Sequence, residues 1–140
     1  MILFADTSAL VKLYIDEPGS EAIAANAAIA TMLAVSRITW AEMMSAFARR
    51  TREQPAASDG VAQARRHFNE DWPQFLVLDV TQALVERAGE YAEAFALRAY
   101  DSVQLAAICT LHLELPSEVR FACYDSRLVS AARVLGIASV

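Results

Sequence analysis

The sequence has few of the features that would place a protein in a membrane, in an oxidising compartment or around a zinc ion. No apolar stretch approaches the roughly 20 residues that a helix needs to cross a bilayer, and no basic segment precedes the short apolar run at the N-terminus. The only cysteines are Cys109 and Cys123, and neither belongs to a Cys/His cluster with zinc-site spacing. We therefore expect a cytoplasmic protein with no disulfide, no structural zinc and no membrane association.

Positive charge is also in short supply. The formal net charge is −5, which excludes a protein that holds nucleic acid by overall positive charge alone. The 12 cationic residues include a single lysine, Lys12, and the arginines are unevenly spread: Arg49 and Arg50 are adjacent, as are Arg65 and Arg66. Arginine suits bidentate contact with phosphate, but such pairs are equally typical of a solvated helix surface. The sequence leaves both interpretations open.

Apolar residues, by contrast, are abundant. Hydrophobic side chains make up 56% of the 140 residues, which excludes a disordered chain and is enough for one domain with a real core. We expect residues 1–140 to form a single domain, because no linker, repeat or low-complexity segment divides them. A single domain of this size does not easily bury so many apolar side chains, so the composition favours association with a partner chain.

Short apolar runs alternate with helical stretches along the chain. The expected strands are residues 2–5, 32–36, 75–79 and 119–124, with a short final strand at 137–140. The expected helices are residues 7–15, a segment that starts at 20 and continues through the Ala-rich stretch, 39–54, 58–72, 81–98, 101–115 and 125–136. This alternation predicts right-handed crossovers and a three-layer α/β sandwich, with a central, mostly parallel sheet of four to five strands flanked by helices.

One local pattern recurs where helices are expected to begin: an aspartate followed by a hydroxyl residue. It reads DTSAL at Asp6, DSVQL at Asp101 and DSRL at Asp125. Because ligands of open α/β sheets collect beyond the carboxyl ends of the strands, Asp6 and Asp125 are candidates for a functional site. Each of the three also suits an N-cap, whose side chain accepts hydrogen bonds from free backbone N–H groups. For any single one of them the cap is the simpler interpretation.

Two further acids have structural interpretations of their own. Asp79 follows the third apolar run with D-x-x-Q spacing, which resembles a capping box, and we assign it a structural role. Thr39 and Glu42 have the T-x-x-E spacing of a capping box at the start of helix 39–54, and position alone favours that role. On a helical wheel, however, Glu42 lies opposite the apolar face and on the same side as Arg49. That face suits a metal ion and a phosphate.

If these carboxylates converge, they require a cation. Two unit charges about 4 Å apart repel by roughly 4 kcal/mol at an effective dielectric near 20. Oxygen ligands select hard ions: Mg²⁺ typically takes one or two carboxylates, keeps several waters and completes its shell with substrate phosphate. Mn²⁺ accepts the same ligands. A convergent set of these acids therefore indicates a site for Mg²⁺, with Mn²⁺ as a substitute.

The order and spacing of these motifs resemble those of the PIN domain, and more narrowly the VapC-type toxin ribonucleases of bacterial toxin–antitoxin pairs. The resemblance rests on DTSAL after the first strand, an isolated glutamate in the helix after the second, YDSVQLA in a late helix and YDSRLVSAARVLG near the C-terminus. It spans essentially the whole chain. It implies an endoribonuclease that hydrolyses RNA phosphodiesters as the toxin of a type II pair, with a homodimer and a small antitoxin as partners.

The resemblance also implies roles for individual residues. The acidic quartet, which is catalytic and binds Mg²⁺ or Mn²⁺, consists of Asp6, Glu42, Asp101 and Asp125. Ser8 takes the position of a hydroxyl that assists the first aspartate, and Arg49 and Arg50 are candidates for holding the RNA backbone. The chain departs from the family pattern at Cys123, where a hydroxyl residue is usual, and at Tyr100, which is bulkier than expected. The hydroxyl contacts and the shape of the pocket are expected to differ there.

Two other functions are compatible with the same class of fold. A receiver-type phosphoacceptor also clusters acids beyond strand ends, and Asp79 suits its phosphorylated position, but Lys12, the only lysine, is not after the last strand as that function requires. The second alternative is a PIN-type fold that has lost activity and serves as an RNA- or protein-binding module. The presence of all four acids favours an active enzyme over such a module.

Overall fold

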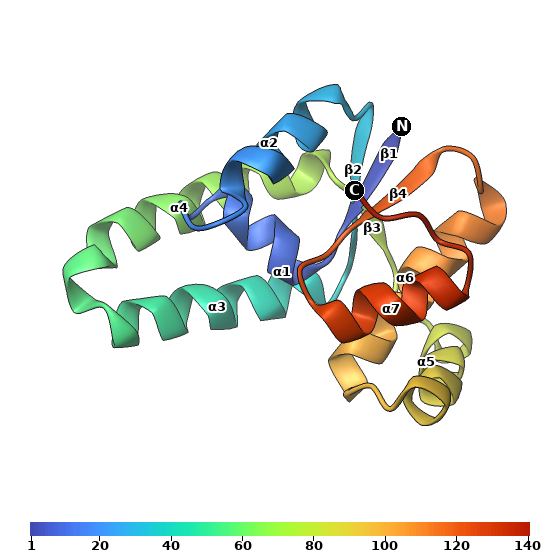
Figure 1. Ribbon diagram of the computed structural model, residues 1–140. Coiled ribbons are helices and arrows are strands. Elements are labelled where there is room, and N and C mark those ends of the chain that lie inside the picture. The colour runs from blue at the N-terminus through green and yellow to red at the C-terminus, as the bar shows by residue number, and fades with distance from the viewer.

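Four parallel strands form the centre of the computed structural model, which describes residues 1–140 (Figure 1). They are β1 (Ile2–Ala5), β2 (Met32–Ser36), β3 (Leu76–Leu78) and β4 (Val119–Ala122), in the order β3-β2-β1-β4. Each strand is a short apolar run, as strands covered on both faces require. Because β2 and β3 extend the sheet on one side of β1 and β4 on the other, the topological switch point lies between β1 and β4. Ligands of such sheets bind beyond the strand ends at this point.

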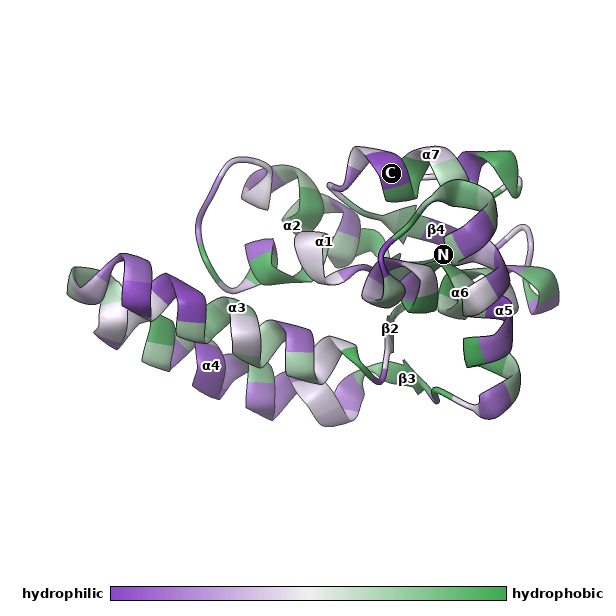
Figure 2. Ribbon diagram, turned by 90° about the horizontal axis from the view of Figure 1, so that it is seen from below, coloured by the Kyte–Doolittle hydropathy of each residue, from purple (hydrophilic) through white to green (hydrophobic).

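Seven α-helices cover the two faces of this sheet (Figures 1 and 2). One face carries α1 (Thr7–Leu10), α2 (Ser20–Ile29), α3 (Thr39–Glu53) and α4 (Ser58–Asp71), and the other carries α5 (Gln82–Phe95), α6 (Ala99–Glu114) and α7 (Ser126–Val134). Short 3₁₀ turns lie at Val11–Leu13, Pro55–Ala57 and Trp72–Gln74. The predicted three-layer α/β sandwich is confirmed, with a sheet of four strands. None of the helices combines the length and the apolar character needed to span a bilayer.

The strands divide the core into two halves, because successive side chains of a strand point to opposite faces of the sheet. In β1, Leu3 and Ala5 pack with the helices α1 to α4, whereas Phe4 packs with α5, α6 and α7. In β4, Phe121 lies on the same side as Phe4, with ring centroids 6.0 Å apart, and Ala122 lies on the opposite side. All five side chains are buried. Packing on both faces therefore fixes the strand ends that precede Asp6 and Asp125.

Helices α3 and α4 form an antiparallel hairpin that extends away from the sheet (Figures 1 and 2). An aromatic cluster joins them: the ring of Phe68 lies 6.0 Å from that of Phe47 and 5.3 Å from that of Trp40. Met43 and Phe47 are buried, as the helical spacing predicts, while Trp40 keeps 38% of its surface exposed at the edge of the cluster. This packing fixes the helix that carries Glu42.

Two predicted elements are much shorter in the structure, and the helix predicted over residues 81–98 ends at Phe95. The helix predicted over residues 7–15 is one α-helical turn, Thr7–Leu10, that tightens into the 3₁₀ turn Val11–Leu13. Lys12, in this turn, forms an ion pair with Glu17, with 2.8 Å between Nζ and Oε1. The pair stabilises the loop that follows the 3₁₀ turn. The strand predicted over residues 137–140 is a single bridge between Phe121 and Ser139, because the chain meets the free edge of β4 at one residue only.

Candidate active site

Asp6 follows β1 directly and caps the short helix α1. Its Oδ2 accepts hydrogen bonds from the backbone N–H of Ser8 at 3.0 Å and from the Ser8 hydroxyl at 2.6 Å, so the N-cap interpretation is correct. The residue is only 5% exposed, which is unusual for a cap at the surface. The side-chain donors around it all contact Oδ2, and Oδ1 accepts no side-chain hydrogen bond. One oxygen is therefore anchored and the other is available.

Glu42 is not part of a capping box, contrary to the prediction from T-x-x-E spacing. The N-cap of α3 is Ile38, which makes no side-chain cap bond, and Thr39 already lies inside the helix. Because the helix begins one residue early, the reciprocal bonds of a capping box do not form. Glu42 Oε1 instead accepts hydrogen bonds from Thr7 Oγ1 at 3.1 Å and from Gln104 Nε2 at 2.7 Å. The glutamate thus ties α3 to α1 and α6.

Gln104 positions Glu42 from the buried side of α6. Its side chain is fully buried, and Nε2 donates a second hydrogen bond to Thr39 Oγ1 at 2.9 Å. The amide cannot turn over without presenting its oxygen to the Glu42 carboxylate. Gln104 Oε1 is buried without a hydrogen-bond partner, which costs about 1–3 kcal/mol. The core thus tolerates an unpaired oxygen while the amide N–H groups bind Glu42 and Thr39.

Asp101 lies in the first turn of α6 and is not its cap. The helix begins at Ala99, two residues before the predicted start, and its N-cap is Arg98. The cap interpretation is therefore wrong for this aspartate. No hydrogen bond perturbs its carboxyl group, which responds only to burial and to neighbouring charges. A half-buried carboxylate without an internal partner is free to bind a ligand.

Asp125 caps α7, as the sequence predicts. Its Oδ1 accepts hydrogen bonds from the backbone N–H groups of Arg127 at 2.9 Å and Leu128 at 3.0 Å. Both bonds are made to the same oxygen, as at Asp6. The cap fixes the side chain where the chain leaves β4, next to the end of β1 in the sheet. Asp6 and Asp125 therefore stand on the two sides of the switch point.

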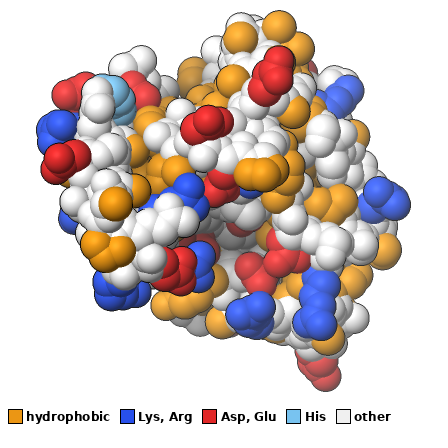
Figure 3. Space-filling model, turned by 60° about the vertical axis from the view of Figure 1, so that its left-hand side comes forward, with side chains coloured by type: hydrophobic (Ala, Val, Ile, Leu, Met, Phe, Trp, Pro, Cys, Tyr) orange, Lys and Arg blue, Asp and Glu red, His pale blue; other side chains and the backbone are white.

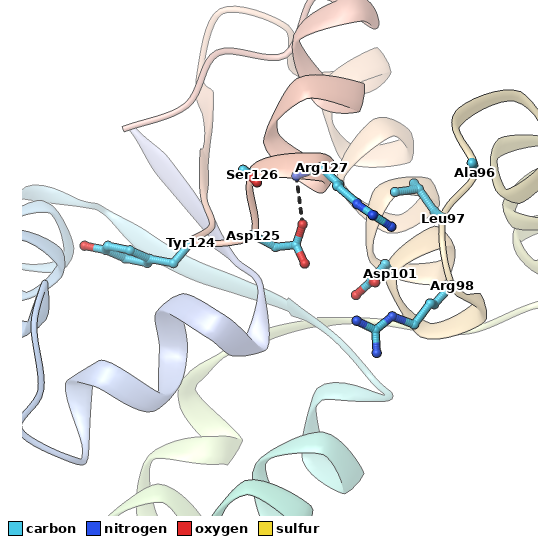
Figure 4. A pocket seen from close by; sticks show the side chains of 8 residues that line it. All are labelled: Ala96, Leu97, Arg98, Asp101, Tyr124, Asp125, Ser126 and Arg127. Atoms are coloured by element: carbon cyan, nitrogen blue, oxygen red, sulfur yellow. Dashed lines mark hydrogen bonds between the residues drawn. The ribbon is translucent and has the colours of Figure 1, made fainter.

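Asp101 and Asp125 line one hollow of about 430 Å³ between the N-terminal ends of α6 and α7 (Figure 4). Its lining consists of Ala96, Leu97, Arg98, Asp101, Tyr124, Asp125, Ser126 and Arg127. In Figure 4 both carboxylates point into the space between the two helices. Figure 3 shows a hollowed face of the molecule on which acidic side chains lie among separate basic ones. The lining of the hollow in Figure 4 carries two acids and two arginines, although the whole molecule is acidic.

The acids influence one another although they come from separate elements. Burial raises the pKa of Asp6. Burial also raises the pKa of Glu42, as do the negative charges of Asp6 and Asp101, whereas the hydrogen bonds from Gln104 and Thr7 lower it. The pKa of Asp101 is raised by burial and then by the charges of Asp125 and Asp6, with Arg98 opposing. The carboxylates are thus close enough to disfavour each other's ionised forms, and a bound cation would relieve that repulsion.

The acidic side chains are not arranged around one common ion position in this structure. No three acidic, histidine or cysteine groups are close enough together to hold one metal ion. The donor set nevertheless fits Mg²⁺ or Mn²⁺ chemically, because it consists of carboxylate oxygens, and Asp6 and Asp125 each have all their side-chain bonds on one oxygen. Binding an ion requires a carboxylate to turn inward. Asp101 has the freedom to do so, because no hydrogen bond restrains it.

Ser8 and Cys123 contact Asp6 from two sides. The Ser8 hydroxyl donates to Asp6 and accepts a hydrogen bond from the backbone N–H of Tyr124 at 2.9 Å. Cys123 is a free thiol whose Sγ lies 3.7 Å from Asp6 Oδ2. Burial, together with the charge of Asp6, raises the pKa of Cys123 to about 12, so the thiol stays protonated and is a weak donor. A cysteine therefore makes the contact that a hydroxyl would make more strongly.

Replacing Cys123 with serine is expected to lower the pKa of Asp6. A hydroxyl is the stronger donor to a carboxylate, so it favours the ionised form of Asp6. The matched variant Cys123→Ala removes the donor and is expected to raise the pKa of Asp6 further. An NMR titration of the Asp6 carboxyl group measures both shifts. Shifts in the same direction for the two variants would show that this contact does not tune Asp6.

The arginines predicted to hold the RNA backbone lie outside the hollow. Arg50 is half-buried, with Nη1 3.8 Å from Glu17 Oε2, and Arg49 is exposed on α3. The hollow is lined instead by Arg98 and Arg127, neither of which was predicted as a site residue. Arg98 was predicted as the last residue of the helix 81–98, whereas α5 ends at Phe95 and Arg98 is the N-cap of α6. Arg127 lies within the DSRL motif, in which only Asp125 was predicted to be a site residue.

The acid that follows β3 has a different role. Asp79 forms an ion pair with Arg37, and the N-cap of α5 is Thr81, whose hydroxyl accepts a hydrogen bond from the N–H of Leu84 at 3.2 Å. The D-x-x-Q spacing therefore does not mark a cap at Asp79. Since β2 separates β3 from β1, the residue is also remote from Asp6 in the sheet. A receiver-type grouping of acids around Asp79 is absent.

Residues 3–133 match the family model of the PIN domain. The chain belongs to the PIN domain family. A protein of Mycobacterium tuberculosis named Ribonuclease VapC45 is 30% identical over 135 residues, which cover 96% of this chain and 92% of that protein. A toxin–antitoxin complex from Klebsiella pneumoniae contains a chain with a TM-score of 0.61 and 21% identity, over 90% of this chain and 88% of that one. VapBC2 from Rickettsia felis, bound to a promoter DNA fragment, contains a chain with a TM-score of 0.66 and 13% identity, over 100% of this chain and 98% of that one. These two structures share the fold of this PIN domain.

Proposed function

We propose that this PIN domain is a metal-dependent endoribonuclease that hydrolyses RNA phosphodiesters as the toxin of a type II toxin–antitoxin pair. The observation that carries the proposal is the convergence of acids from separate elements at the switch point. The charges of Asp6 and Asp101 raise the pKa of Glu42, and the charges of Asp125 and Asp6 raise that of Asp101. The name of the relative, Ribonuclease VapC45, supports RNA as the substrate at 30% identity.

The same acids are the proposed ligands of Mg²⁺, for which Mn²⁺ would substitute. Asp6 and Asp101 are the first choices for direct ligation, and Glu42 and Asp125 would orient water or a second ion. When bound, a divalent ion in such a site polarises a phosphoryl oxygen and lowers the pKa of a water molecule that attacks the phosphorus. Oxygen donors alone suit this role, because hard divalent ions prefer them.

The chain's own contribution is to fix carboxylate oxygens before the substrate arrives. Ser8 holds one oxygen of Asp6, and Thr7 and Gln104 hold one oxygen of Glu42. The backbone at the start of α7 holds one oxygen of Asp125. Groups that are positioned in advance need little reorganisation during the reaction, which lowers its barrier. Burial of Asp6 also excludes bulk water from one side of the site.

The proposal includes a small antitoxin, a second copy of this chain and a cytoplasmic location. The titles of the structurally similar toxin–antitoxin complexes support an antitoxin partner. Exposed apolar side chains are available for protein contacts: Ile29 is 73% exposed and Leu113 is 65% exposed. Arg49 and Arg50 on α3 stay proposed contacts for RNA that extends beyond the hollow.

The direct test of the function is cleavage of total RNA by the purified protein. We expect fragments in the presence of Mn²⁺ and none when EDTA is added, because the carboxylates alone repel the phosphate backbone. Cleavage that persists in EDTA would contradict the metal dependence. RNA binding without cleavage at any Mn²⁺ concentration would favour the inactive binding module.

In a chelating buffer, the free energy of unfolding is expected to increase as the pH falls through the raised pKa values of the buried acids toward their ordinary values. The pKa values of Asp6, Glu42 and Asp101 are raised above their ordinary values of 3.8 for aspartate and 4.5 for glutamate. Between the ordinary and the raised values the folded protein binds more protons than the unfolded chain, so stability decreases as the pH rises through that window. Melting curves in EDTA at several pH values measure the effect.

Added Mn²⁺ is expected to remove this trend and to raise the melting temperature most at neutral pH, where the carboxylates are ionised. A melting temperature in EDTA that decreases steadily as the pH is lowered through the same window would contradict the repulsion between the acids.

A further inference from the structure

Two arginines line the hollow beside Asp101 and Asp125 without forming ion pairs with them. Arg98 is the N-cap of α6, and Arg127 lies in the first turn of α7. Figure 4 shows the two guanidinium groups on either side of Asp101 in that view. The ion pairs of the molecule use other cations, namely Lys12, Arg37 and Arg50. The N–H donors of Arg98 and Arg127 therefore remain available to a ligand in the hollow.

The chemistry of these donors fits a phosphate group. A guanidinium presents five N–H donors in a planar fork that matches two phosphate oxygens. The charge of Arg98 already lowers the pKa of Asp101, so this cation is near enough to act on groups in the hollow. Because the net charge of the chain is −5, long-range attraction does not bring RNA to the site, and local cations must hold it there.

A second hollow continues from the first along α7. It has a volume of about 500 Å³, lies between the end of α5 and α7, and shares Ala96, Ser126 and Arg127 with the hollow that holds the acids. Phe95 and Val134 contribute apolar surface to it, and Val134 is 74% exposed. Ala96 borders both hollows and lies in the turn between α5 and α6, where it adopts a left-handed conformation with φ of 53°.

The groups along this path match those of a nucleotide. Arg98 and Arg127 lie on either side of Asp101 in the first hollow (Figure 4), Arg127 borders both hollows, and the apolar surface of Phe95 and Val134 lies beyond it. A single strand presents phosphates for the cations and a base face for an apolar surface, whereas the bases of a duplex are stacked inside and not accessible. The path thus suits single-stranded RNA.

We propose that Arg98 and Arg127 hold the phosphate next to the scissile bond, and that the groove between α5 and α7 receives the base of that nucleotide. The inference rests on the proposed ribonuclease function and adds the direction in which the strand leaves the acids. It assigns substrate positioning to α6 and α7, while Arg49 and Arg50 on α3 serve more distant parts of the RNA.

The test uses steady-state cleavage of a single-stranded RNA oligonucleotide in Mn²⁺ by the double variant Arg98→Ala/Arg127→Ala. We expect KM to rise about tenfold with kcat changed less than about twofold, because the cations bind substrate in the ground state and transition state alike. We also expect the slope of log(kcat/KM) against log salt concentration to decrease in magnitude by about 0.7, the contribution of one neutralised phosphate of a single strand. The cap of α7 survives, because Asp125 bonds to the backbone of Arg127.

Matched variants separate local contacts from general charge. Arg65→Ala/Arg66→Ala removes the same charge from the exposed surface of α4 and is expected to leave KM and the salt slope unchanged. Arg98→Lys/Arg127→Lys keeps the charge, so it should restore the salt slope and part of the affinity. Val134→Asp places a negative charge in the groove at an exposed position and is expected to raise KM several-fold.

The outcomes distinguish this inference from the proposed function. If the unmodified protein cleaves no RNA in Mn²⁺, the proposed function fails, whatever the variants do. If it cleaves RNA and the Arg98→Ala/Arg127→Ala variant keeps the KM and salt slope of the unmodified protein, the inference alone is overturned. Equal changes in the α4 double variant would also overturn it, because they would show a general electrostatic effect.

Discussion

Replacing Asp6 with asparagine is expected to lower the rate of RNA cleavage by about a thousandfold or more, equivalent to about 4 kcal/mol of transition-state stabilisation. The asparagine oxygen still accepts the hydrogen bonds that Ser8 donates, so the cap of α1 is kept. What the variant loses is the negative charge that a divalent ion requires of a buried carboxylate. Initial rates at saturating Mn²⁺ and RNA measure the loss, and melting curves confirm that the variant is folded.

Asp79→Asn is the matched control for this variant. It also removes a carboxylate that follows a parallel strand of the same sheet, but its partner is Arg37 at the surface and it lies beyond β2 from the site. The control is expected to cleave RNA at the normal rate. Normal cleavage by Asp6→Asn would rule Asp6 out as a metal ligand and leave it a helix cap alone.

Replacing Asp101 with asparagine is expected to abolish cleavage to a similar extent without loss of stability. No hydrogen bond holds the Asp101 carboxylate, and burial together with the charges of Asp125 and Asp6 raises its pKa. Its ionised form is therefore unfavourable in the metal-free protein, and removing the charge should leave the melting temperature in EDTA unchanged or raised. The opposite effects on activity and stability are typical of a residue kept for function.

Comparison with Asp125→Asn makes this test sharper. Asparagine is as good an N-cap as aspartate, so the bonds to Arg127 and Leu128 are kept and only the charge is removed. Because Asp125 is proposed to orient water rather than to ligate directly, its loss should reduce cleavage less than the loss of Asp101. A marked decrease in the melting temperature of Asp101→Asn in EDTA would contradict this account, because it would show that the carboxylate stabilises the fold.

The sheet could be predicted from the sequence because its strands are brief apolar runs bounded by polar or turn residues. β1 and β2 occupy the predicted residues 2–5 and 32–36, and their ends place Asp6 at the carboxyl edge. Elements that depend on a partner were predicted less well. Residues 137–140 have strand-like composition, but they pair with β4 at Ser139 alone.

The acids of the site could be predicted from the sequence, but the residues that hold them by hydrogen bonds could not. Asp6 and Asp125 follow strands, and that relation is local in sequence. The bond from Gln104 to Glu42 joins residues 62 positions apart, so no spacing rule predicts it, even though Gln104 stands three residues after Asp101 in the motif DSVQL. The same limit explains why Glu42 was interpreted as half of a capping box. Its partners, Thr7 and Gln104, become neighbours only when α1 and α6 pack beside α3.

The most direct test of the central claim is the position of Mn²⁺ in crystals of the protein, located from its anomalous scattering. We expect a peak at the switch point between β1 and β4, about 2.1 Å from carboxylate oxygens of Asp6 and Asp101, with the Asp101 side chain turned toward it. A protein that cleaves RNA in Mn²⁺ but binds the ion only elsewhere would contradict the claim that these acids share a divalent ion.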